Sequence, residues 1–125
     1  MMANKTVLVI DDDQDVFETL SFGLESFGYH VIWAKDGTEG CKKAEEVNPN
    51  LIVLDFSLAN NETGLDILHK LKSHSSVLVR TIPVVMLTGH EEYERACLDA
   101  GAGGYITKPF DLFQLKEKLA QLLPG

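Results

Sequence analysis

Cysteine, basic side chains and long apolar stretches are all scarce in this chain. Of its 125 residues only two are cysteines, Cys41 and Cys97, and they follow no metal-binding or redox spacing, so we expect two free thiols in a reducing compartment. Its 11 Lys and Arg against 19 Asp and Glu give a net charge of −8, which argues against this chain alone binding the phosphate backbone of a nucleic acid. No apolar run approaches the ~18 residues of a transmembrane helix, so we expect no contact with a membrane.

The amino-terminal segment lacks the apolar core of a secretion signal. Only four strongly apolar residues, Val7–Ile10, come before three aspartates. We therefore expect a cytoplasmic protein. The rest of the composition, 45% hydrophobic and 24% charged, is ordinary for a globular protein, and the length predicts a single domain over residues 1–125 with a real core.

Short apolar runs alternate with helical patterns five times along the chain. Between the runs, apolar residues recur at steps of three and four, as on one face of a helix. Asp36, Thr63 and Asp111 each precede such a pattern and are expected to cap it, together with the residue three positions on. A further helix is expected from the first turn at Glu91 to Gly101. The apolar runs, each interpreted as a strand, are Val7–Ile10, Val31–Trp33, Leu51–Leu54, Ile82–Leu87 and Tyr105–Ile106.

The expected strands are continuous apolar runs, without alternation of polar and apolar residues. Such runs are typical of a parallel sheet that helices cover on both faces, so the pattern predicts a doubly wound α/β fold. Ligands of these folds bind beyond the carboxyl ends of the strands. Polar side chains stand at that end of four strands, and they are Asp11, Asp12, Asp55, Thr88 and Lys108.

If the first and third strands are neighbours, Asp11, Asp12 and Asp55 share one pocket. Two carboxylates ~4 Å apart repel by about 4 kcal/mol at an effective dielectric near 20. Either a pKa must rise or a hard cation must lie among the three acids. Mg²⁺ suits such a site because it binds through one or two carboxylates and keeps several waters.

A carboxylate held beside Mg²⁺ and a lysine can act as a nucleophile toward phosphorus. Asp55 would form an aspartyl-phosphate, while the ion and Lys108 stabilise charge on the transferred group. The Thr88 hydroxyl can donate a hydrogen bond to a phosphoryl oxygen. Taken singly, Thr88 is equally an ordinary strand-end residue and Lys108 a surface lysine, but coincidence explains the whole set poorly. Asp13 and Asp15 are each interpreted as a helix cap or a solvated first-turn charge, and not as a metal ligand.

Four motifs, spread over nearly the whole chain, are together highly specific. They are VLVIDDD (Val7–Asp13), LIVLD (Leu51–Asp55), PVVMLTG (Pro83–Gly89) and GAGGYITKPF (Gly101–Phe110). With them the sequence resembles the receiver domain of two-component response regulators. The resemblance implies a five-stranded parallel sheet in the order 2-1-3-4-5, a flavodoxin-like sandwich. It also implies a phosphorylation-dependent signalling switch, not an enzyme acting on free substrates.

The resemblance implies a role for each acid of the pocket. Asp55 matches the phosphoacceptor. Asp11 and Asp12 match the acidic pair that positions Mg²⁺, with Asp12 as the expected direct ligand. The backbone carbonyl of Ser57 matches the remaining protein ligand of the metal. Mn²⁺ is the alternative ion at this site.

Three further residues match groups that respond to the phosphoryl group. Thr88 and Lys108 match the switch hydroxyl and the lysine that act with Asp55, and Tyr105 matches the aromatic residue whose rotamer follows Thr88. The Lys108–Pro109 bond is expected to be cis. The resemblance implies that these residues alter a surface formed by the fourth helix, the fifth strand and the fifth helix, which is also the expected face of a homodimer.

The implied phosphodonor is a sensor histidine kinase or a phosphotransfer protein. The last expected helix ends close to Gly125, so no output domain is expected within this chain. The sequence departs from the family in one place. The stretch 58–64 after the acceptor lacks the usual Pro and contains one extra residue, which puts the shape of this loop in question.

Three other functions fit parts of the pattern. A Mg²⁺-dependent phosphohydrolase of small molecules would also use an aspartyl intermediate, but haloacid-dehalogenase-type enzymes carry an acid/base aspartate two residues after the nucleophile, where this chain has Ser57. An FMN carrier on the same architecture needs a phosphate-binding loop after Ile10, where three aspartates would repel phosphate. A receiver-like interaction module that is never phosphorylated has no need of the intact acidic set.

Overall fold

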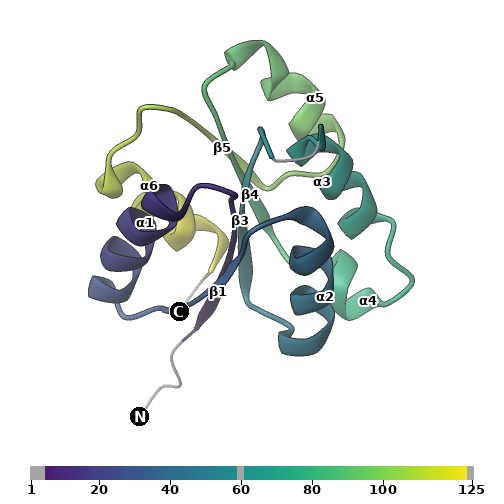
Figure 1. Ribbon diagram of the computed structural model, residues 1–125, viewed down its shortest axis with the longest axis horizontal. Helices are drawn as coiled ribbons and strands as arrows, with labels where there is room; N and C mark the ends of the chain where they lie inside the picture. The colour runs from purple at the N-terminus through teal and green to yellow at the C-terminus, as the bar shows by residue number, and fades with distance from the viewer. Residues whose placement is uncertain (1–4, 59–60, 124–125) are drawn as a thin grey trace.

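Five parallel strands form one sheet in the order β2-β1-β3-β4-β5 in the computed structural model, which describes residues 5–58 and 61–123 (Figure 1). The strand order implied by the family resemblance is therefore confirmed. Each strand closely follows a predicted apolar run. The strands are β1 (Thr6–Ile10), β2 (His30–Ala34), β3 (Leu51–Asp55), β4 (Val84–Thr88) and β5 (Gly104–Thr107).

Helices cover both faces of this sheet, as the continuous apolar runs predict. Two helices lie on one face and the others lie on the opposite face (Figure 1). The first group is α1 (Gln14–Ser26) and α6 (Leu112–Leu122). The second group is α2 (Gly37–Val47), α3 (Gly64–Lys72), the short α4 (Val77–Arg80) and α5 (Glu94–Asp99).

Successive residues of each strand enter opposite hydrophobic cores, because side chains alternate across a strand. On β3, Leu51 and Val53 pack toward α1 and α6, while Ile52 and Leu54 pack toward α2, α3 and α5. Strands β3 and β4 are buried along their entire length. Packing on both faces therefore fixes the last residues of these two strands, Asp55 and Thr88.

Side chains cap the predicted helix starts. Thr63 and Asp111 each form a reciprocal capping box with the residue three positions on, as predicted. Asp36 caps α2 by accepting a hydrogen bond from the Glu39 backbone N–H (2.8 Å). The Glu39 carboxylate forms an ion pair with Lys43 (2.9 Å), so at this helix only the Asp36 half of the predicted pairing is present.

Two elements differ from the sequence-based expectation. The helix predicted from Glu91 to Gly101 is divided into a 3₁₀ turn, η1 (Glu91–Tyr93), and the six-residue α5 (Glu94–Asp99), neither of which has a side-chain N-cap bond. The four-residue α4 was not predicted, because it is too short to show a helical period. Among residues 5–58 and 61–123, no helix has the length and apolarity to cross a membrane.

Candidate functional site

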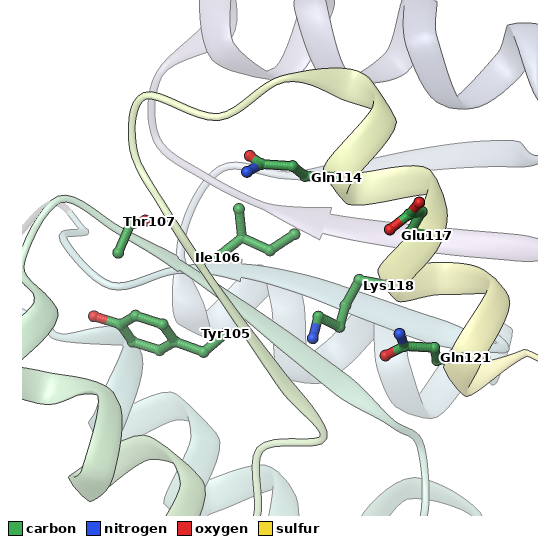
Figure 2. Close-up of a pocket in the computed structure, with 7 residues that line it drawn as sticks. All are labelled: Tyr105, Ile106, Thr107, Gln114, Glu117, Lys118 and Gln121. Carbon is green, nitrogen blue, oxygen red and sulfur yellow. The ribbon is translucent and has the colours of Figure 1, made fainter.

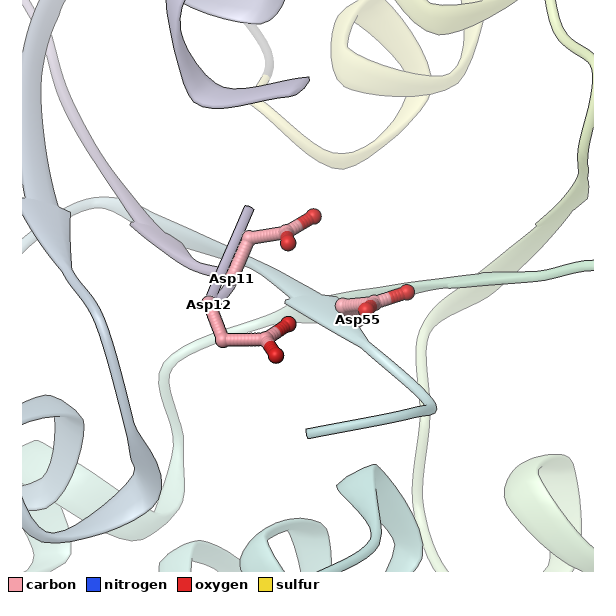
Figure 3. A group of neighbouring side chains, drawn as sticks. All are labelled: Asp11, Asp12 and Asp55. Carbon is pink, nitrogen blue, oxygen red and sulfur yellow. The ribbon is translucent and has the colours of Figure 1, made fainter. Parts of the chain in front are cut away.

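The acidic cluster lies where β1 and β3 end side by side. Ile10, the last residue of β1, pairs with Leu54 of β3. One residue further along the chain, Asp11 directly after β1 therefore lies beside Asp55 at the end of β3. One carboxylate oxygen from each of Asp11, Asp12 and Asp55 lies within 4.8 Å of the others. Figure 3 shows the carboxylates of Asp11 and Asp12 pointing to the side on which Asp55 lies. The predicted convergence of these three acids is confirmed.

Local hydrogen bonds fix the turn that carries Asp11 and Asp12. The Asp11 N–H donates to the carbonyl of Ala34 (3.0 Å), which extends the β1–β2 pairing by one residue. The Asp13 N–H donates to Oδ1 of Asp11 (2.9 Å), closing an Asx turn. Asp13 in turn caps α1 by accepting from the N–H of Asp15 (2.9 Å). Of the two roles predicted for this pair of acids, Asp13 is therefore the helix cap and Asp15 the first-turn charge.

Burial makes the ionised form of two of the acids costly. Asp11 is only 1% exposed and Asp55 only 4%. Burial raises the pKa of Asp11 to about 6, with the charge of Asp55 adding to the rise. Burial also raises the pKa of Asp55, opposed by its hydrogen bond and charge interaction with Lys108. The pocket therefore attracts positive charge.

Lys108 supplies one positive charge to the pocket. Its Nζ lies 2.7 Å from Oδ1 of Asp55, and its backbone N–H donates to the carbonyl of Thr88 (2.7 Å). The Lys108–Pro109 peptide bond is cis, as predicted. The lysine is thus placed by β5 and the following turn, and it reaches across β4 to the end of β3.

The donor set fits a hard divalent cation. Oδ2 of Asp11 is buried and has no hydrogen-bond partner in the described part of the chain. Such an orphaned carboxylate oxygen is unfavourable unless a cation or water satisfies it. Three carboxylates within 4.8 Å offer only oxygen ligands, which Mg²⁺ and Mn²⁺ prefer. The metal role predicted for the Ser57 carbonyl stays a prediction.

Thr88 and Tyr105 are connected through the backbone of His90. Thr88 is buried at the end of β4, and its Oγ1 accepts a hydrogen bond from the N–H of His90 (3.0 Å). The Tyr105 hydroxyl donates to the carbonyl of the same residue, and burial raises the pKa of Tyr105. Sequence reasoning missed this role of His90, because a main-chain group carries it and no side-chain signal reports it.

The loop after β3, which departs from the family pattern, closes as a small bridge. Ser57 and Thr63 pair in antiparallel fashion, and the N–H of Leu58 donates to the carbonyl of Glu62 (3.2 Å). Oε1 of Glu62 accepts from the N–H of Gly37 at the start of α2 (3.1 Å), a tether that the sequence did not reveal. Residues 59–60, part of the stretch without Pro, lie outside the described residues.

Fold and site together define a class: a doubly wound α/β domain that presents three acids, a lysine and a hydroxyl at the carboxyl ends of its strands. The chain belongs to the response regulator receiver domain family, whose model matches residues 7–120. Receivers of two-component response regulators are phosphorylation-dependent signalling switches, and this is the class of function that the family assigns to the chain.

Individual relatives agree with this assignment. The chain is 37% identical over 122 residues to the alkaline phosphatase synthesis transcriptional regulatory protein PhoP of Bacillus subtilis, covering 96% of this chain and 49% of the relative. It is 33% identical over 124 residues to the phosphate regulon transcriptional regulatory protein PhoB of Pseudomonas aeruginosa, covering 98% and 53%. The chain thus spans about half the length of these curated relatives.

Solved structures show the same architecture. The chemotaxis protein CheY4 of Vibrio cholerae superposes with a TM-score of 0.87 at 28% identity, covering 97% of this chain and 100% of that one.

Proposed function

We propose that this chain accepts a phosphoryl group on Asp55 from a phosphohistidine donor, a sensor histidine kinase or a phosphotransfer protein. One observation carries the proposal. Carboxylate oxygens of Asp11, Asp12 and Asp55 lie within 4.8 Å of one another, and the Nζ of Lys108 lies 2.7 Å from Asp55. A buried carboxylate with a neighbouring cation site and a lysine is suited to attack on phosphorus.

The chain's own residues divide the work of transfer. A carboxylate oxygen of Asp55 forms the new bond to phosphorus as the bond from phosphorus to the donor imidazole nitrogen breaks, and the electron pair leaves with the imidazole. As Asp55 loses negative charge to the new bond, its ion pair with Lys108 weakens. The lysine then stabilises the oxygens of the transferred phosphoryl group by its charge and by hydrogen bonds. The Thr88 hydroxyl, buried at the end of β4, is placed to donate to another of these oxygens.

Asp11, Asp12, Asp55 and the Ser57 carbonyl would hold Mg²⁺, or Mn²⁺ in its place. When bound, the ion supplies positive charge that offsets the acids and the phosphoryl oxygens. Asp11 would contribute its buried Oδ2, which has no hydrogen-bond partner in the described part of the chain. Self-phosphorylation with small phosphodonors and self-dephosphorylation are the only reactions that we assign to the chain.

The signal would pass from Asp55 to a surface made of η1, α5, β5 and α6. Thr88, moving toward the phosphoryl group, would lose its bond from the His90 N–H and so free the segment to which Tyr105 is tied. Shifting such a two-state equilibrium from mostly one state to mostly the other takes about 5.5 kcal/mol of differential stabilisation.

Partner binding is assigned to this same surface. A hollow between β5 and α6 lies beside Tyr105 and is lined by Gln114 and Lys118 of α6, among others (Figure 2). Contact with a downstream partner, or with a second copy of the chain in a homodimer, would use this face. Three expectations stay predictions. They are that residues 1–125 form a single receiver domain, that this chain alone does not bind nucleic acid, and that it is located in the cytoplasm.

The phosphohydrolase alternative finds no support at the site. The position two residues after the proposed nucleophile is Ser57, an exposed residue with no carboxylate to act as acid and base. The alternative of a receiver that is never phosphorylated would leave the costly clustering of three acids without a function.

Incubation with a small-molecule phosphodonor and Mg²⁺ tests the proposal. We expect intact-mass spectrometry to show one added phosphoryl group, lost at alkaline pH, with none in Asp55→Asn or when the metal is chelated. Asp66→Asn, which alters an exposed carboxylate at the α3 cap, should be phosphorylated like the wild type. An adduct that survives in Asp55→Asn would refute the assignment.

A further inference from the structure

The single tryptophan of the chain is hydrogen-bonded to the backbone of the turn Asp11–Asp13, which we call the acidic turn. Trp33 lies on β2 opposite Val9 of β1, so its side chain is on the α1 side of the sheet. From there its indole Nε1–H donates to the main-chain carbonyl of Asp11 at 2.8 Å. This carbonyl belongs to the peptide group that joins Asp11 to Asp12. The hydrogen bond from the indole therefore fixes the orientation of that peptide group.

Trp33, Phe17, Asp13 and Asp11 form a ring in which each residue contacts the next. The indole of Trp33 stacks on Phe17 of α1, with centroids 5.0 Å apart and an interplanar angle of 14°. The N–H of Phe17 donates to the carbonyl of Asp13 (3.0 Å), and the N–H of Asp13 donates to Asp11 (2.9 Å). The Nζ of Lys43 also donates to the carbonyl of Trp33 (2.6 Å), which fixes the tryptophan from the α2 side.

We propose that Trp33 is a positioning residue that preorganises the acidic turn for a divalent cation. This inference rests on the proposed function, because it concerns the metal site of that function. Asp11, Asp12 and Asp55 repel one another when no cation is bound, so an unrestrained turn would let the carboxylates move apart. Hydrogen bonds that orient a metal ligand commonly change metal affinity by about 10–100-fold. A bond to the ligand's backbone should have a smaller effect.

A stack on Phe17 does not by itself require an indole at this position. A phenyl ring can also stack on Phe17, but it lacks the N–H that the indole donates to the Asp11 carbonyl. Trp33→Phe therefore separates the two roles, since it keeps an aromatic ring and deletes the N–H. Phe17→Leu is the matched variant, because it weakens the stack and keeps the indole donor.

Calorimetric titration of metal-free protein with Mg²⁺ is the test, and it does not depend on phosphorylation. We expect Trp33→Phe to weaken Mg²⁺ binding by about 3- to 10-fold, the range that one neutral hydrogen bond supports, and Phe17→Leu to weaken it less. Equal affinities of Trp33→Phe and the wild type would overturn the positioning role and leave the proposed function intact. A wild type that binds no Mg²⁺ would overturn both.

Fluorescence gives a second readout that needs no change at position 33. The only indole in the chain donates a hydrogen bond to the acidic turn, so Mg²⁺ should change the tryptophan emission of the wild type. The Mg²⁺ concentration at half of this change should agree with the dissociation constant from calorimetry. Asp12→Asn should reduce the change, whereas Asp99→Asn on α5 should leave it as it is. Unchanged emission of the wild type at Mg²⁺ saturation would contradict the coupling of Trp33 to the site, even if Trp33→Phe did not fold.

Discussion

At the scale of single residues, burial sets the electrostatic state of Asp11, which is only 1% exposed. Asp11 was predicted as one acid of a pair, and its position in the pocket is confirmed. That one of its oxygens is buried without a partner in the described part of the chain follows only from three-dimensional packing. The same holds for the hydrogen bond between Trp33 and the Asp11 carbonyl, which joins residues on separate strands.

Asp11→Asn should stabilise the metal-free protein. The pKa of Asp11 is raised from 3.8 to about 6 in the folded state, so the folded protein binds this proton more tightly than the unfolded chain does. Its contribution to stability therefore falls as the pH rises from about 4 to about 6, and the full penalty applies above pH 6. At pH 7.5 we expect Asp11→Asn to raise the free energy of unfolding by at most about 3 kcal/mol, because each pKa unit corresponds to about 1.4 kcal/mol.

Urea unfolding at a series of pH values, with a chelator present, measures this effect. The difference between Asp11→Asn and the wild type should vanish below about pH 4. Glu46→Gln, on the exposed side of α2, is the control and should change little at any pH. A destabilised Asp11→Asn protein at pH 7.5 would contradict the argument.

Removing Lys108 should separate metal binding from phosphoryl transfer. Its Nζ lies 2.7 Å from Asp55 and repels a second cation at the same acids. We expect Lys108→Met to bind Mg²⁺ a few-fold more tightly in calorimetry, yet to accept a phosphoryl group at least about tenfold more slowly, because a charge that stabilises the transition state is lost. Weaker Mg²⁺ binding in Lys108→Met would count against the proposed geometry.

At the scale of elements, the long amphipathic helices were predictable and the short ones were not. The apolar face of α1 gave a clear period, and Leu20 and Leu24 are fully buried as that period implies. By contrast, α4 spans only Val77–Arg80. It is held by the Ser76 side chain, which caps it, and by Val79, which is buried in the same hydrophobic core as the apolar face of α3. A single turn has no period to detect, so tertiary contacts decide it.

The α1 face provides a direct test of the core. Leu24→Ala should lower the free energy of unfolding by about 3 kcal/mol, because it leaves a cavity in a fully buried position. Phe22→Ala removes a larger side chain from the same helix, but Phe22 is 78% exposed, so the change should stay within about 0.5 kcal/mol. Urea unfolding checks both, and a comparable loss for the two variants would contradict the assigned helix face.

At the scale of the whole molecule, strand order is what converts separate motifs into one site. Continuous apolar runs predicted a parallel sheet with helices on both faces, but they carried no information on which strands are neighbours. The order came from the family resemblance. Once β1 and β3 pair, the register places Asp11 next to Asp55 without any further assumption.

Binding of Mg²⁺ should stabilise the entire domain by mass action. At a free concentration one hundred times the dissociation constant, a ligand specific for the folded state adds about 2.7 kcal/mol to the free energy of unfolding. We expect thermal unfolding of the wild type to shift upward with Mg²⁺ accordingly, and Asp12→Asn and Asp55→Asn to show little shift. An equal shift in those variants would place the ion elsewhere.

The most direct test of the central claim is to locate the ion itself. Mn²⁺ can replace Mg²⁺ at carboxylate sites and is visible by anomalous diffraction. Crystals grown with Mn²⁺ should give one strong anomalous peak among the carboxylates of Asp11, Asp12 and Asp55, in contact with oxygens of Asp12 and Asp55. No peak there at saturating Mn²⁺, or a peak bound by other residues only, would contradict the account.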